Sequence, residues 1–164
     1  MFKRILVPLD GSACAQQAFE VALSLAKSEH AELEICSVVD PIVICGTTPP
    51  SPALDLLLRD AEIEARRLVT TAVQLAHVAG VGAAGEALMG VPFDEIRKVA
   101  GRTHADAIVM GTHGRTGLRR LFLGSVAESV LRGSPCPVII VRERGAHEPA
   151  PSTASKGTDE PGDG

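Results

Sequence analysis

The sequence predicts an α/β fold, a single doubly wound open sheet of five mainly parallel strands with helices on both faces. Five short apolar runs alternate with segments of helical periodicity, an order typical of parallel sheets with right-handed crossovers. Hydrophobic residues make up 45% of the chain and aromatic residues only 2%. The core must therefore be aliphatic, which suits a buried parallel sheet. The 164 residues suffice for one domain with a substantial core.

The first half of the chain indicates strand, helix, strand, loop and helix in that order. An apolar run over residues 5–9 predicts the first strand, and the 3.6-residue spacing of apolar positions over 15–26 predicts a helix. Residues 32–39 alternate polar and apolar, as a second strand would. Residues 40–52 are rich in Pro, Gly and Thr and are expected to form a loop. A long helical pattern over about 54–79 follows, and a glycine ends it.

The second half alternates strands and helices up to the last strand. Pro92, with two acidic residues close behind it, is typical of the first turn of a helix that runs to about residue 102. The other predicted elements are strands over 81–89, 105–110 and 137–141 and a helix over 125–132. We expect one domain over residues 1–144, followed by a disordered acidic tail over 145–164, because the Pro, Ser, Thr and Gly of that tail bury little apolar surface.

Composition argues against several classes of protein. The formal net charge is −4, no basic face is evident and aromatic rings are few, so no nucleic-acid partner is expected. No run reaches the roughly 18 apolar residues of a membrane span. Asp10 soon interrupts the apolar stretch after Lys3-Arg4, unlike a secretory leader. The four cysteines show no metal-site spacing, so no metal site is predicted. We expect a cytoplasmic protein without membrane contact.

Two polar segments follow predicted strand ends and contain the candidate phosphate-binding residues. The first is Asp10-Gly11-Ser12, and the second is the glycine-rich stretch 111–125. In open parallel sheets, ligands bind at the carboxyl ends of strands, where the strand order reverses. Glycines there let backbone N–H groups approach a phosphate, and a helix beginning at Ser125 would direct its positive end to the same place. Simple helix caps, including a Ser125–Glu128 capping box, remain the alternative.

The glycine spacing resembles the nucleotide-binding pattern of universal stress proteins. Gly111, Gly114, Gly124 and Ser125 match G-x2-G-x9-G-S/T. The resemblance extends over residues 1–143 or so, through the segments ILVPLDGS, GVPFDEI, ADAIVMGTHGRTG, LGSVAESV and CPVIIVR. It implies a Rossmann-like fold of the adenine nucleotide alpha hydrolase-like type, and ATP as the ligand, with or without Mg²⁺.

The resemblance also implies roles for individual residues. Asp10 would contact the ribose or base side of the nucleotide, and the backbone around Val38 would face the adenine edge. The glycines of the pattern and Ser125 would surround the phosphates, with Met110 and Val126 beside them. The full predicted set is Pro8, Asp10, Ser12, Val38, Met110, Gly111, Gly114, Arg115, Gly124, Ser125 and Val126. Because Asp10 also follows a strand directly, a helix-cap role shared with Ser12 is the structural alternative.

Three classes of function are considered for this sequence. The first is a regulator in which ATP occupancy changes conformation or partner binding. The second is a slow ATPase or phosphotransferase, and the third is a nucleotide-free dimeric interaction module. The chain contains no G-x4-G-K-S/T, G-x-S-x-G or H-E-x-x-H motif, which disfavours an efficient enzyme. The intact glycine pattern disfavours the third class. The sequence therefore favours the regulator, and it names no downstream protein partner.

The last strand is the candidate dimer interface. Val138 to Val141 are all apolar and β-branched. If this strand lies at a sheet edge, its unpaired backbone would favour pairing with the same strand of a second copy. The resemblance implies the same homodimer. The alternative is an edge protected by Arg142, Glu143 and the tail.

Overall fold

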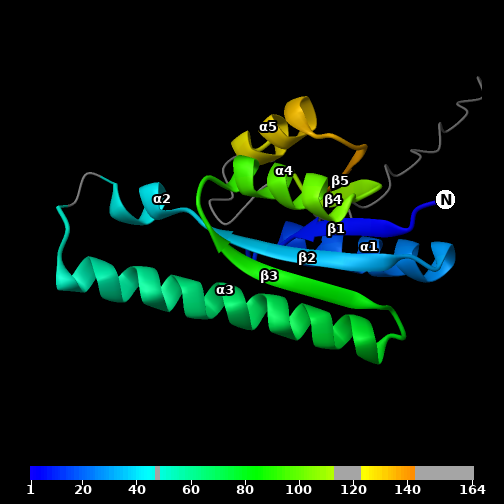
Figure 1. The fold of residues 1–164 in the computed structure, drawn as a ribbon, viewed down its shortest axis with the longest axis horizontal. Helices are drawn as coiled ribbons and strands as arrows, with labels where there is room; N and C mark the ends of the chain where they lie inside the picture. The colour runs from blue at the N-terminus through cyan, green and yellow to red at the C-terminus, as the bar shows by residue number, and fades with distance from the viewer. Residues whose placement is uncertain (47–48, 113–122, 143–164) are drawn as a thin grey trace, which may run out of the picture.

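The computed structural model of the chain describes residues 1–46, 49–112 and 123–142 (Figure 1). A single sheet lies at its centre, in the strand order β3-β2-β1-β4-β5, and every neighbouring pair is parallel. The predicted α/β fold is confirmed. The strands are β1 (Arg4–Pro8), β2 (Glu32–Val39), β3 (Ala83–Met89), β4 (Ala107–Gly111) and β5 (Val138–Val141).

Helices cover both faces of the sheet and bury two aliphatic clusters. Figure 1 shows α3 on one side of the sheet and α4 and α5 on the other. Along β1, Ile5 and Val7 belong to the cluster under α1 and α3, whereas Leu6 belongs to the cluster under α4 and α5. Burying each of these side chains stabilises the fold by roughly 1.5–3 kcal/mol. The helices are α1 (Ala13–Glu29), α2 (Pro41–Cys45), α3 (Pro52–Val78), α4 (Pro92–Thr103) and α5 (Ser125–Gly133).

The short helix α2 corrects the sequence prediction, which made all of residues 40–52 a loop. Asp40 caps this helix, since its Oδ1 accepts hydrogen bonds from the N–H groups of Ile42 at 2.9 Å and Val43 at 3.3 Å. Pro41 occupies the first turn, where its missing N–H costs no hydrogen bond. The prediction was wrong because the Pro- and Gly-rich composition of the whole segment outweighed this local start signal.

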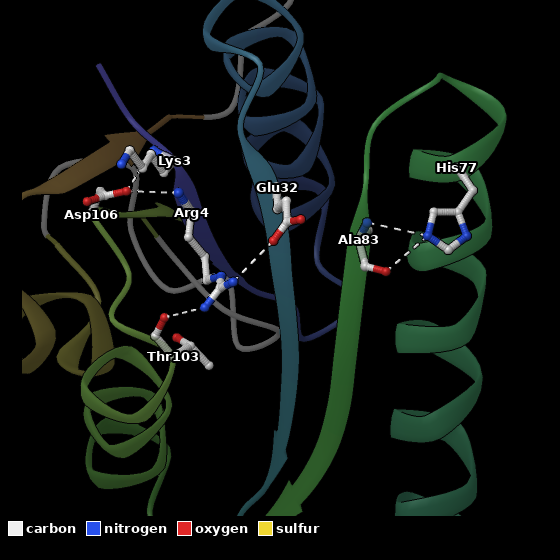
Figure 2. A network of polar contacts seen from close by, with 7 residues as sticks. All are labelled: Lys3, Arg4, Glu32, His77, Ala83, Thr103 and Asp106. Carbon is white, nitrogen blue, oxygen red and sulfur yellow. Dashed lines mark hydrogen bonds and ion pairs between the residues drawn. The ribbon is translucent and has the colours of Figure 1, made fainter.

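A polar network centred on Arg4 connects the amino-terminal ends of the central strands (Figure 2). The Asp106 carboxylate accepts hydrogen bonds from the backbone N–H groups of Lys3 at 2.6 Å and Arg4 at 2.8 Å. The Arg4 guanidinium donates to the carbonyl of Thr103 at 2.7 Å and to Glu32 at 3.1 Å. These bonds tie the start of β1 to Glu32 at the start of β2 and to Asp106, which precedes β4.

The two edges of the sheet differ in how they are covered. At the outer edge of β3, the His77 Nε2 atom lies 3.0 Å from the carbonyl oxygen and 3.3 Å from the nitrogen of Ala83 (Figure 2). At the other edge, β5 contributes Ile139 and Val141 to one cluster and Val138 and Ile140 to the other. The strand order places β5 at an edge, which is the condition that the sequence analysis set for pairing with a second copy. Among the described residues, no helix is long and apolar enough to cross a bilayer.

Candidate functional site

A cavity of about 210 Å³ opens at the carboxyl ends of β1 and β4. From β1 the chain turns toward β2, and from β4 it turns toward β5, so the strand order reverses between these two strands. This is the place where open α/β sheets bind ligands. The cavity is lined by the ends of three strands, the residues that follow them and the starts of three helices. The lining residues are Pro8, Leu9, Asp10, Ala15, Val38, Pro92, Ile96, Met110, Gly111, Thr112, Gly124, Ser125, Val126 and Ala127.

Most of the residues predicted for the site meet at this cavity. They come from four separate parts of the chain, and those in the lining are Pro8, Asp10, Val38, Met110, Gly111, Gly124, Ser125 and Val126. Ser12 is not in the lining and instead caps α1. Gly114 and Arg115 lie outside the described residues. The tail over 145–164 does as well.

Asp10 and Ser12 form the turn that leads from β1 into α1. The Ser12 Oγ atom accepts a hydrogen bond from the Ala15 N–H at 3.2 Å, and Asp10 Oδ1 accepts one from the Ser12 N–H at 3.0 Å. Gly11 between them has a φ of 81°, a conformation that glycine adopts without strain. Ser12 therefore caps α1, as the capping alternative expects. Asp10 takes part in the same turn and also lines the cavity.

Gly111 lies where β4 meets the first turn of α1. A Cβ atom at Gly111 would lie 2.7 Å from the Cβ of Cys14 and 3.0 Å from the backbone nitrogen of Ala15. Cβ atoms essentially never come that close to other heavy atoms, so a side chain here would force the strand and the helix apart. This packing requires a glycine whether or not a phosphate binds beside it.

The first turn of α5 faces the cavity without a side-chain cap of its own among the described residues. Gly124 is the N-cap residue and Ser125 is the first helical residue, so the capping box of Ser125 with Glu128 does not form. Glu128 instead pairs with Arg132, one turn further along the helix, at 2.8 Å. The backbone N–H groups of a helix start attract anions, and the helix dipole adds to this attraction.

The lining combines an apolar part with two polar groups of different kinds. Val38, Ile96 and Met110 provide apolar surface, and the start of α5 provides N–H donors. Asp10 is the carboxylate in the lining. Within the described ranges, no three His, Cys, Asp or Glu side chains gather closely enough to hold a metal ion. The arrangement suits a ligand with a flat apolar end, a hydroxylated middle and an anionic end.

Several lining residues were missed by the sequence prediction. Leu9 directly follows Pro8, and Thr112 directly follows Gly111. This adjacency to predicted site residues was the signal that could have identified them. Pro92 and Ile96 come from α4, which reaches the cavity only through tertiary packing. Both belong to the segment GVPFDEI of the family resemblance, but that segment did not indicate which of its residues would reach the cavity.

Comparisons with known proteins agree with this architecture. The model of the universal stress protein family matches residues 1–142. The universal stress protein MJ0531 of Methanocaldococcus jannaschii is 37% identical over 143 residues, which cover 87% of this chain and 84% of that protein.

Solved structures of similar proteins also superpose on this chain. The hypothetical protein MJ0577, whose biochemical function was assigned from its structure, superposes with a TM-score of 0.78 at 28% identity, over 89% of this chain and 99% of that one. A universal stress protein in complex with cAMP superposes with a TM-score of 0.61 at 25% identity, over 87% and 98%. The chain belongs to the universal stress protein family.

Proposed function

We propose that the chain is a cytoplasmic ATP-binding stress-response regulator, in which nucleotide occupancy modulates conformation or partner binding. The observation that carries this proposal is the first turn of α5, which opens onto the cavity without a side-chain cap from the described residues. The related structure in complex with cAMP, at 25% identity, supports an adenine nucleotide as the ligand.

The size of the cavity suggests how a nucleotide would lie. Small-molecule sites usually enclose roughly 300–1,000 Å³, and this cavity has about 210 Å³. It would therefore enclose the base and the sugar, with Val38 and Met110 against the adenine and Asp10 near the ribose. The phosphates would extend past Gly124 and Ser125. Gly114, which is the remaining glycine of the pattern, and Arg115 are proposed to complete the phosphate site, with or without Mg²⁺.

We also propose that two copies pair through β5. This strand lies at the edge of the sheet, and its four side chains are only partly covered within the chain. A second copy related by a two-fold axis would pair both edges at once, in a closed assembly.

Titration calorimetry with ATP, ADP, AMP and adenosine tests the nucleotide proposal. ATP should bind more tightly than adenosine, because only ATP carries phosphates to the start of α5. A Gly114→Val variant should bind ATP at least about tenfold more weakly, since charge-assisted hydrogen bonds are worth about 1.5–3 kcal/mol.

Gly101→Val is the matched control for this titration. A Cβ at Gly101, in α4, meets no atom within 4 Å, so this variant should bind ATP as the parent does. ATP and adenosine binding equally, or a folded Gly114→Val variant with the parental affinity, would contradict the phosphate site.

A further inference from the structure

Thr112 connects four elements around the cavity. It directly follows β4, it is 5% exposed, and it belongs to the cavity lining. Its backbone N–H donates to the carbonyl of Val141 at the end of β5, at 2.9 Å. Its carbonyl accepts from the N–H of Gly124, the N-cap residue of α5, at 2.8 Å.

The side chain of Thr112 provides the contact with α1. Its Oγ1 atom lies 3.7 Å from the Sγ atom of Cys14, within hydrogen-bonding range for sulfur, and either atom can donate. Cys14 is also buried, and Gly111 leaves no space between the strand and this turn of α1. Because α1 on this side and β5 on the other fix Thr112, its carbonyl has little freedom to rotate.

The position of that carbonyl matters for the helix that follows. The Gly124 N–H donates to Thr112, and the Gly124 carbonyl accepts the N–H of Glu128 at 2.9 Å. The first turn of α5 is therefore tied to Thr112 at the residue from which the helix starts. A shift of Thr112 would shift the donors that face the cavity.

We propose that Thr112 is a positioning residue, which holds the start of α5 at a fixed distance from α1 through its contact with Cys14. Its effect on ligand affinity rests on the proposed function, because it requires that the cavity bind a nucleotide. Thr112 acts through Gly124, and it needs no contact of its own with the ligand.

Two substitutions separate the hydroxyl from the shape of the side chain. Thr112→Val keeps the β-branched shape and removes the hydroxyl, whereas Thr112→Ser keeps the hydroxyl and removes a methyl group. We expect Thr112→Val to weaken ATP binding by about threefold to tenfold, the effect of losing one intramolecular hydrogen bond. Thr112→Ser should stay within about twofold of the parent. Cys14→Ala should reproduce the loss, and the double variant Cys14→Ala/Thr112→Val should add little to it.

Hydrogen exchange of the Gly124 amide gives a readout that does not need the ligand. In Thr112→Val this amide should exchange several-fold faster than in the parent, while amides in the middle of β1 keep their protection. A purely structural role would lower the melting temperature of both Thr112 variants and leave the ATP affinity and the local exchange unchanged.

The two readouts also separate this proposal from the proposed function. Parental exchange at Gly124 and parental ATP affinity in Thr112→Val would overturn the positioning role while the nucleotide site stands. A parent that binds no ATP would overturn the nucleotide site. Faster exchange in Thr112→Val would then still support the positioning of α5.

Discussion

A Cβ atom at Gly111 would lie 2.7 Å from the Cβ of Cys14 and 2.8 Å from its carbonyl carbon. The first glycine of the glycine pattern is therefore required by the packing of β4 against α1. This contact places the end of β4 and the start of α1 on adjoining walls of the same cavity.

Gly111→Ala should therefore destabilise the fold directly. Overpacking of this kind costs about 1–3 kcal/mol, because backbone and not only a flexible side chain must move. Urea unfolding measures the loss. Gly101→Ala is the matched control, since it lies in α4 with open space around its Cβ and should raise stability slightly. A Gly111→Ala variant as stable as the parent would contradict the close packing.

Ser12→Ala and Asp10→Ala should separate capping from ligand contact. Ser12 caps α1 from outside the cavity lining, so its loss should cost about 1 kcal/mol of folding stability and leave ATP affinity nearly unchanged. Asp10 lines the cavity, so its loss should weaken ATP binding more than it weakens folding. Thermal melts and ATP titrations on both variants provide the comparison. If Asp10→Ala lowers the melting temperature with intact affinity, its role is that of a cap.

Asp106 predicts a dependence of stability on acid pH. Hydrogen bonds from the backbone N–H groups of Lys3 and Arg4 lower the pKa of Asp106 below its ordinary value of 3.8. A lowered carboxyl pKa stabilises the folded state above the unfolded pKa, and this contribution disappears as the pH falls through the folded value. The effect should be small, because the side chain is exposed and solvent screens it.

The stability of the parent is compared with that of the Asp106→Asn variant, which lacks the charge. At pH 7 the parent should be the more stable of the two in urea unfolding. The difference should begin to shrink as the pH falls below about 4, where the unfolded chain takes up the proton first, and it should disappear once the folded carboxyl is protonated as well. A difference that stays constant down to pH 2 would exclude the charge of Asp106 as its source.

The proposed dimer is tested best at Val138. Ile108 N–H bonds to Pro137 and Thr112 N–H to Val141, so the odd-numbered residues of β5 direct their backbone groups toward β4. The N–H of Val138 therefore faces the open edge. Val138→Pro removes this donor at the first residue of the strand, where proline is tolerated.

Light scattering at micromolar concentration should give the mass of two 17.1 kDa chains for the parent and of one for Val138→Pro. A cooperative thermal melt would show that the variant is folded, although the loss of the dimer should lower its melting temperature. A parent that stays monomeric with and without ATP would remove the β5 interface.

The sequence predicted the sheet and its helices because their signals are local. Apolar runs and alternation located all five strands, and 3.6-residue spacing located the long helices. The alternation of Ile5, Leu6 and Val7 between two clusters follows from the pleat. The helix α2 was missed although Asp40-Pro41 is a start signal, because it lies within a segment of loop-like composition. The position of β5 at an edge depends on the strand order of the whole sheet. The apolar run alone could not determine that order.

The candidate site was predictable where a motif marks it and hidden where packing makes it. The ends of β1 and β4 and the start of α5 were found from the glycine spacing and from the resemblance to a family. The contribution of Ile96 depends on how α4 packs over the sheet, and the contact of Thr112 with Cys14 joins residues 98 positions apart. The glycine spacing did not show that Gly111 is also required by the packing of β4 against α1.

Mass spectrometry of the nucleotide released when the purified protein is denatured tests the central claim most directly. The claim predicts an adenine nucleotide in a ratio near one per chain, or, for protein purified empty, uptake of added ATP at the same ratio. The same sample, followed over time for ADP, reports any hydrolysis. Protein that releases no nucleotide and takes up none at millimolar ATP would contradict the proposed function.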